Sequence, residues 1–148
     1  MEEKSAFDTF ELNLPPAILG FLKETSTWTY ILSIIGFIGI GLMILAGIIF
    51  SITMGGMLGG NPYESLGIDM SYFGMIYILL GLIYFLPVMY LFNFSRKMKR
   101  ALSLNTNEDL TAAFSNLKSH YKFLGVFTIV IISLYVLIVV IAMISATM

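Results

Sequence analysis

The sequence predicts an all-α integral membrane protein with three transmembrane helices, an amphipathic cytoplasmic helix between spans two and three, and a short interfacial N-terminal helix. Of its 148 residues, 58% are hydrophobic and 11% are charged, whereas soluble domains have about 45–50% and about 25%. Three uncharged stretches are each long enough to cross a bilayer. The composition excludes a soluble globular domain, and we expect residues 1–148 to form a single membrane domain.

The three predicted spans are residues 30–53, 70–94 and 123–148, none of which contains a charged side chain. About 24 residues at about 1.5 Å each reach about 36 Å, which crosses a hydrocarbon core of ~30 Å with some tilt. Pro87 interrupts the second span and deprives the Ile83 carbonyl of its helical partner. We therefore expect a kink near the inner end of that span.

The residues before the first span, 1–29, are expected to be a cytoplasmic segment. The run Leu14-Pro15-Pro16 ends any earlier helix, and prolines suit the first turn of a new one, so residues 17–29 are predicted to form the interfacial helix. The acidic start, Met1-Glu2-Glu3-Lys4, is unlike a secretory signal peptide. After the first span, glycines and Asn61-Pro62 favour turns, which predicts a flexible outer loop over residues 54–69.

The connection between the second and third spans, 95–122, is predicted to contain a helix of its own, 107–122. We expect the second span to continue as helix to near Leu104, before an Asn-Thr-Asn stretch of poor helix formers. Thr106 and Asp109 then have the spacing of a capping box, with Asp replacing Glu or Gln. Steps of three and four place these apolar residues on one face of the helix: Leu110, Ala113, Phe114, Leu117, Tyr121 and Leu124. This face is expected to pack on neighbouring helices or to bind anionic lipid.

The basic residues indicate the orientation of the chain. Six of the eight Lys and Arg residues lie between spans two and three, the other two, Lys4 and Lys23, precede the first span, and residues 54–69 have none. Because cytoplasmic loops retain Lys and Arg, we expect a cytoplasmic N-terminus and a C-terminus outside.

Four of these cations form a basic cluster directly after the second span: Arg96, Lys97, Lys99 and Arg100. A cation near an anionic leaflet gains about 1 kcal/mol. The simplest interpretation is that this inner-leaflet basic cluster fixes the topology. Recognition of an anionic lipid or of a partner protein is the alternative.

Small and hydroxyl-bearing side chains mark faces on which the spans can associate, because helices in lipid pack closely through small residues and hydrogen bonds. We select one set of residues as a helix-packing or oligomer face: Gly36, Gly47, Gly74, Tyr77, Gly81 and Tyr84. Helix packing within one bundle is the simpler interpretation. A ligand-lining face or a contact between copies of the chain remains open.

Few residues could carry chemistry. The chain has no cysteine and one histidine, His120, which excludes thiolate and multi-histidine metal sites. The three spans contain no ionisable acid or base of the kind that pumps and ion-coupled transporters place at membrane depth. We expect no enzyme activity, no catalytic residue, no cofactor and no metal, and we interpret His120 as an interfacial polar residue.

Several short runs, taken in order, resemble a known family. They are Leu22-Lys-Glu-Thr25, Thr27-Trp28, Ile35-Gly-Phe-Ile-Gly-Ile-Gly-Leu-Met43, Tyr84-Phe-Leu-Pro87, Phe94-Ser95 and, within residues 110–122, Ala112, Phe114 and Asn116-Leu-Lys118. Together they cover roughly residues 22–142 and resemble a family of small bacterial inner-membrane proteins catalogued as a domain of unknown function. The resemblance implies a bacterial cytoplasmic membrane and a domain that occupies the whole chain. It implies no activity, cofactor or site.

The function that these observations favour is that of a non-enzymatic interaction or scaffold protein, or of a small subunit of a membrane complex. Its expected partners are the lipid bilayer, with anionic lipid as one option, and a second copy of the chain or another membrane protein. Nucleic acid is not expected. The alternative function is a lipid or small-solute channel or transporter formed between protomers.

Overall fold

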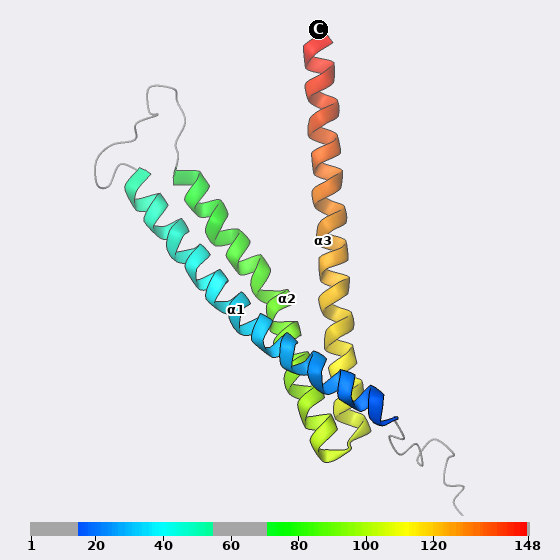
Figure 1. Ribbon diagram of the computed structural model, residues 1–148. Coiled ribbons are helices and arrows are strands. Elements are labelled where there is room, and N and C mark those ends of the chain that lie inside the picture. The colour runs from blue at the N-terminus through cyan, green and yellow to red at the C-terminus, as the bar shows by residue number, and fades with distance from the viewer. Residues whose placement is uncertain (1–14, 55–70, 148) are drawn as a thin grey trace, which may run out of the picture.

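The computed structural model describes residues 15–54 and 71–147, which form three α-helices (Figure 1). They are α1 (Pro16–Met54), α2 (Ser71–Leu104) and α3 (Asn107–Thr147). Each is long and apolar enough to cross a membrane. The all-α class and the three candidate spans are thus confirmed. The predicted outer loop, apart from Met54, and residues 1–14 lie outside the described residues.

Two of the predicted boundaries are not breaks in the structure. α1 runs without interruption from Pro16, so residues 17–29 are its first turns and not a separate helix. Its hydroxyl residues do not end the helix because they bond within it: the Oγ1 atoms of Thr27 and Thr29 donate to carbonyls one turn back, at 3.0 Å and 2.8 Å. Likewise, residues 107–122 continue into the third span as one helix, and Gly125 at the start of that span does not interrupt it.

α1 and α2 form an antiparallel hairpin (Figure 1). The residues that face each other recur at seven-residue intervals on both helices. The buried residues of α1 are Ser26, Ser33, Ile40 and Gly47. The matching positions of α2 are Gly74, Gly81, Val88 and Ser95. A seven-residue repeat keeps one face of each helix on its partner along a left-handed crossing. Because most of these residues are small, the two backbones approach closely along the hairpin.

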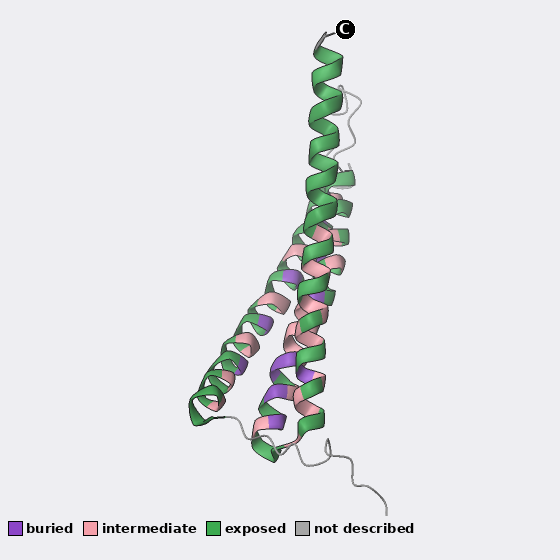
Figure 2. Cartoon of the chain, turned by 90° about the vertical axis from the view of Figure 1, so that its right-hand side faces the viewer, coloured by how far each residue is buried: buried purple, intermediate pink, exposed green. Residues whose placement is uncertain are grey.

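α2 also packs against α3, whereas the described parts of α1 and α3 make no close backbone contact with each other. α2 and α3 lie side by side over the part of each helix nearer their joint, as far as the Tyr84–Phe127 ring contact, and then diverge (Figure 1). From Thr128 to Ala146 every residue of α3 is exposed (Figure 2), and none of its most apolar 18-residue stretch is buried. α3 therefore diverges from the hairpin after its first half.

The joint between α2 and α3 is a tight turn. α2 ends at Leu104, as expected, and Asn105 takes a φ of 53°, a left-handed conformation that Asn tolerates better than most residues. The Thr106 amide donates to the Ala101 carbonyl at 3.3 Å, which is the bond of a Schellman motif. The Leu110 amide donates to the Thr106 carbonyl at 3.3 Å and begins α3. The chain reverses direction here within two residues.

Candidate functional site

The end at which α2 passes into α3, residues 93–117, contains the buried hydrophobic cluster of the described residues, and we call it the corner. Phe94, Met98 and Ala113 form its buried core. Partly buried leucines from all three helices pack against this core: Leu22, Leu102, Leu110 and Leu117. The corner is thus a packed platform, and the charged side chains of the basic cluster surround it.

A buried hydrogen bond fastens α1 to the corner. The Ser95 hydroxyl of α2 donates to the Ser26 carbonyl of α1 at 2.7 Å, and both residues are fully buried. The Ser26 hydroxyl in turn donates to the Lys23 carbonyl within its own helix, at 2.8 Å. These polar atoms are satisfied, which removes the cost of burying them.

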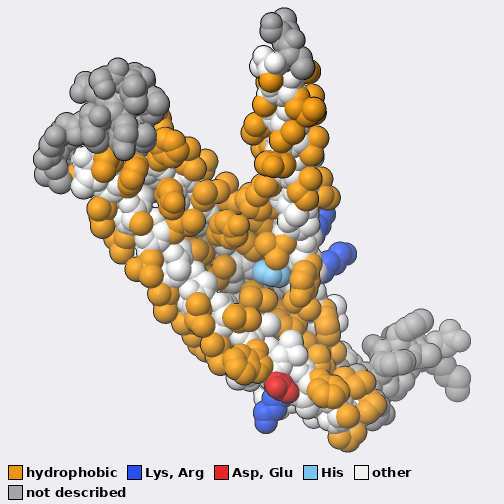
Figure 3. Space-filling view, turned by 45° about the horizontal axis from the view of Figure 1, so that its top comes forward, with side chains coloured by type: hydrophobic (Ala, Val, Ile, Leu, Met, Phe, Trp, Pro, Cys, Tyr) orange, Lys and Arg blue, Asp and Glu red, His pale blue; other side chains and the backbone are white. Residues whose placement is uncertain are grey.

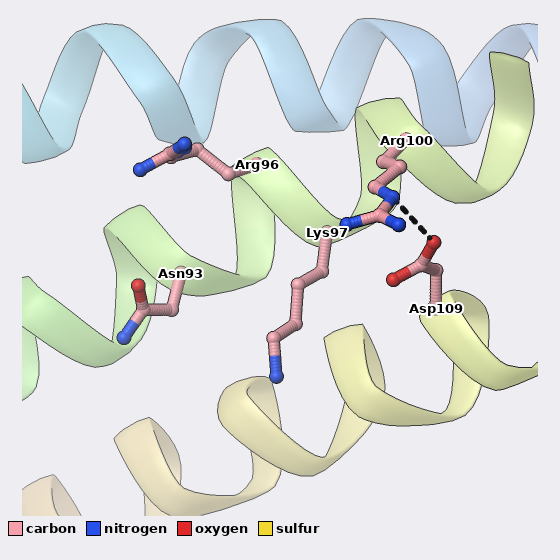
Figure 4. A pocket seen from close by; sticks show the side chains of 5 residues that line it. All are labelled: Asn93, Arg96, Lys97, Arg100 and Asp109. Atoms are coloured by element: carbon pink, nitrogen blue, oxygen red, sulfur yellow. Dashed lines mark ion pairs between the residues drawn. The ribbon is translucent and has the colours of Figure 1, made fainter.

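The basic cluster is divided between two faces of α2. Arg96, Lys97 and Arg100 line a recess of about 250 Å³ between α2 and α3, together with Asn93 and Asp109 (Figure 4). We call this recess the basic recess. These four α2 residues fall on one face because their spacing is three or four.

Lys99 points the other way. Its Nζ lies 4.3 Å from the centre of the Tyr30 ring of α1, within the range of a cation–π contact. Lys99 also lines a second recess of about 320 Å³, shared with Lys23 and Thr27 of α1. The four cations that the sequence grouped together therefore have different surroundings.

One ion pair joins the two helices at the basic recess. Arg100 Nε lies 3.0 Å from Asp109 Oδ2, and the Thr106 hydroxyl donates to the same oxygen at 3.1 Å. The residues with capping-box spacing thus bond to each other through their side chains. The Arg100 side chain is 69% exposed, so the pair contributes little stability by itself. It directs the Asp109 carboxylate of α3 toward Arg100 of α2.

The residues selected as a helix-packing or oligomer face do not form one surface. Gly36, Gly47, Gly74 and Gly81 lie between α1 and α2, where a Cβ on Gly81 would come within 2.9 Å of the Ile44 side chain. Tyr84 instead faces α3: its ring lies 5.7 Å from the Phe127 ring. Tyr77 borders the hairpin beside Gly47 and is 48% exposed.

His120 has a specific partner that the sequence did not indicate. Its Nδ1 lies 2.8 Å from the carbonyl oxygen of Pro87 in α2, in the hollow where Figure 3 shows the histidine side chain. Since a carbonyl can only accept, Nδ1 carries the proton and donates. α2 remains one helix through Pro87. The carbonyl that His120 contacts belongs to Pro87 itself. It lies one turn beyond the Ile83 carbonyl, which the sequence predicts to lack a helical partner.

The corner presents hydrogen-bond donors and cations. Within residues 15–54 and 71–147, no group of three or more His, Asp or Glu side chains could hold a metal ion. Apolar side chains cover most of the surface in view, and the visible charged side chains lie on the part nearer the corner (Figure 3). The arrangement is suited to contacts with a bilayer and its boundary.

The fold is therefore that of an all-helical protein with three candidate membrane spans. Residues 66–143, just over half of the chain, match a family of unknown function (DUF5362), and the chain belongs to this family. The resemblance seen in the sequence is confirmed at that level. The match includes α2, the corner and most of α3, whereas α1 precedes it. Searches of curated proteins and of solved structures found no match.

Proposed function

We propose that this protein is a non-enzymatic, multi-pass interaction protein of a bacterial cytoplasmic membrane, acting in a homo-oligomer or as a small subunit of a larger complex. The observation that supports this proposal is the exposure of α3. The hairpin and the corner use much of the small-residue surface of α1 and α2 within the chain. By contrast, residues 128–142 of α3 are all exposed, and their apolar surface is available to a partner.

The orientation that we propose places the corner in the cytoplasm and the end of α3 outside. All four cations of the basic cluster lie at the corner, and α1 begins at the same end (Figure 1). Cytoplasmic loops retain such residues. In this arrangement residues 107–122 form an amphipathic cytoplasmic part of α3, whose buried Ala113 faces the corner core. Residues 17–29 of α1 lie at the membrane boundary.

A channel between protomers has less support. A pore shared by several copies needs polar or small residues that face a neighbouring copy. Gly47, Gly74 and Gly81 instead face the other helix of their own hairpin. The hydroxyls of Ser133 and Ser145 on the exposed part of α3 bond to their own helix, at 2.8 Å and 2.9 Å. These groups are therefore poorly placed to line a path for solutes.

The native mass of the protein tests the proposal. The full chain is extracted from its membrane directly into lipid nanodiscs, and its mass and any co-purifying chain are determined by mass spectrometry. A homo-oligomer of defined size, or a complex of fixed stoichiometry with another membrane protein, supports an interaction function. A monomer without any bound chain overturns it.

The orientation has its own test. Because the chain has no cysteine, single cysteines at Ser103 and at Ser65, in the predicted outer loop, can be labelled without background. A maleimide that does not cross membranes is expected to label Ser65→Cys in spheroplasts, and Ser103→Cys only after lysis. The reverse pattern would contradict a cytoplasmic corner.

A further inference from the structure

The basic recess has the composition of an anion site. We propose that it binds a phosphate group, in the first place the headgroup phosphate of an anionic lipid. The proposal stands apart from the function proposed above, because α3 after Phe127 has no part in it. It rests on the charges that line the recess, on how they are held and on where the recess lies.

Positive charge exceeds negative charge in the recess. Its lining contains three cations, Arg96, Lys97 and Arg100, and one carboxylate, Asp109, so three minus one leaves a formal charge of +2. The carboxylate is already engaged by Arg100 and by the Thr106 hydroxyl. Within the described part of the chain, neither Arg96 nor Lys97 has a carboxylate partner. Two cations therefore remain for a ligand.

The cations are held near the recess and do not all extend into solvent. Lys97 is half-buried, and its side chain crosses from α2 toward α3 (Figure 4). The Arg96 guanidinium lies over the Phe92 ring, 5.6 Å from its centre, which restrains it by a cation–π contact. Arg100 is anchored through Nε, so its terminal nitrogens can still donate. Arg96 and Arg100 are exposed, so these contacts order the side chains in part before binding.

The available donors suit a phosphate. Guanidinium and ammonium groups are the side chains that proteins use most for phosphate oxygens, and Asn93 adds an amide that donates. A divalent cation would meet a net positive charge, and an apolar ligand would leave the donors without partners. A volume of about 250 Å³ accommodates a phosphate and the atoms next to it, but not a large solute.

The position favours a lipid as the source of the phosphate. The recess begins at Asn93, directly at the end of the uncharged stretch of α2, where headgroups meet a transmembrane helix. Basic recesses between helices at this depth are known lipid-headgroup sites. Free phosphate from the aqueous side has the same chemistry, and the experiment separates these two sources.

The matched pair Lys97→Gln and Lys99→Gln tests the proposal. The two lysines belong to the same basic cluster, but only Lys97 lines the recess. Delipidated full-length protein in neutral detergent is titrated with dioleoylphosphatidylglycerol, dioleoylphosphatidylcholine or inorganic phosphate, and native mass spectrometry records each bound molecule. Detergent removes the general attraction of an anionic leaflet, so only a built site retains the lipid. Lys97→Arg tests rescue, and thermal stability shows that each variant is folded.

We expect one phosphatidylglycerol to bind the wild type, and to bind Lys97→Gln or Arg96→Gln about fivefold more weakly. Lys99→Gln should bind like the wild type, and Lys97→Arg should restore most of the affinity. If inorganic phosphate binds with the same dependence on Lys97 and displaces the lipid, the phosphate site is supported with free phosphate as its ligand. Equal losses in Lys97→Gln and Lys99→Gln, or equal binding of phosphatidylcholine, would overturn the proposal.

Discussion

The backbones of Gly47 and Gly74 touch. A Cβ atom on Gly47 would lie 2.7 Å from the Gly74 carbonyl oxygen, and one on Gly74 would lie 2.5 Å from the Gly47 carbonyl oxygen. Both obstacles are backbone atoms, which cannot rotate away as a side chain can. The far end of the α1–α2 hairpin therefore depends on glycine at both positions.

Alanine at position 74 is accordingly expected to destabilise the hairpin. Gly74→Ala forces the two helices apart, and overpacking of this kind costs about 1–3 kcal/mol. Gly39→Ala is the control: nothing lies within 4 Å of a Cβ there, and alanine in an open helical position is neutral or favourable. Unfolding in mixed micelles, followed by circular dichroism, measures both. Equal stability of the two variants would show that the close contact does not hold the helices together.

Ser95→Ala tests the buried bond at the opposite end of the hairpin. The substitution removes the donor to the Ser26 carbonyl, and we expect the free energy of unfolding to fall by about 0.5–1.5 kcal/mol. Ser103→Ala serves as the comparison, because Ser103 is exposed and bonds only to the Arg100 carbonyl of its own helix. If both substitutions had the same small effect, the bond between helices would contribute nothing measurable.

The spans could be predicted because they depend on local composition. An uncharged stretch of sufficient length can be recognised from the sequence alone. The end of α2 at Leu104 can be recognised in the same way, because Asn105 can take a left-handed conformation. The predicted boundaries near residues 30 and 122 rest on a change from polar to apolar residues, and both helices continue through that change. Polarity changes the environment of a helix, but it does not end one without a residue that disrupts its hydrogen bonds.

The contacts at the corner could not be predicted, because they depend on which helices lie side by side. Once the turn after Leu104 is known, residues about equally distant from Leu104 on the two antiparallel helices face each other. This relationship pairs Phe94 with Ala113 and Pro87 with His120. The sequence pattern shows which residues share one face of a helix. It does not show which neighbouring helix packs on that face. For this reason the sequence predicts one basic cluster, whereas the fold places Lys99 on a different face from Arg96, Lys97 and Arg100.

His120→Ala is expected to loosen the contact between α2 and α3. It removes the donor to the buried Pro87 carbonyl, and the loss of one such bond costs about 1 kcal/mol. Ser119→Ala is a neighbouring control, since that hydroxyl bonds only to the Ser115 carbonyl within α3. The free energy of unfolding measures both variants. An interfacial histidine with no structural role would give the same stability as the control.

The divergence of α3 can be measured with pairs of cysteines in the natural cysteine-free chain. Tyr84 and Phe127 are in ring contact, with centroids 5.7 Å apart, so Tyr84→Cys with Phe127→Cys is expected to cross-link efficiently through a short bifunctional maleimide. Tyr77 and Leu134 lie seven residues further from the corner on the same helices. They would face each other only if α3 stayed packed on α2.

Tyr77→Cys with Leu134→Cys is therefore expected to cross-link at least about tenfold less than the first pair, as measured by intact mass within one chain. His120→Ala should lower the yield of the first pair, because the Pro87 bond holds α3 beside α2 there. Efficient cross-linking of the second pair within one chain would show that α3 closes on α2 in the membrane. Its apolar surface would then be used within the chain, and the interaction function would lose the observation that supports it.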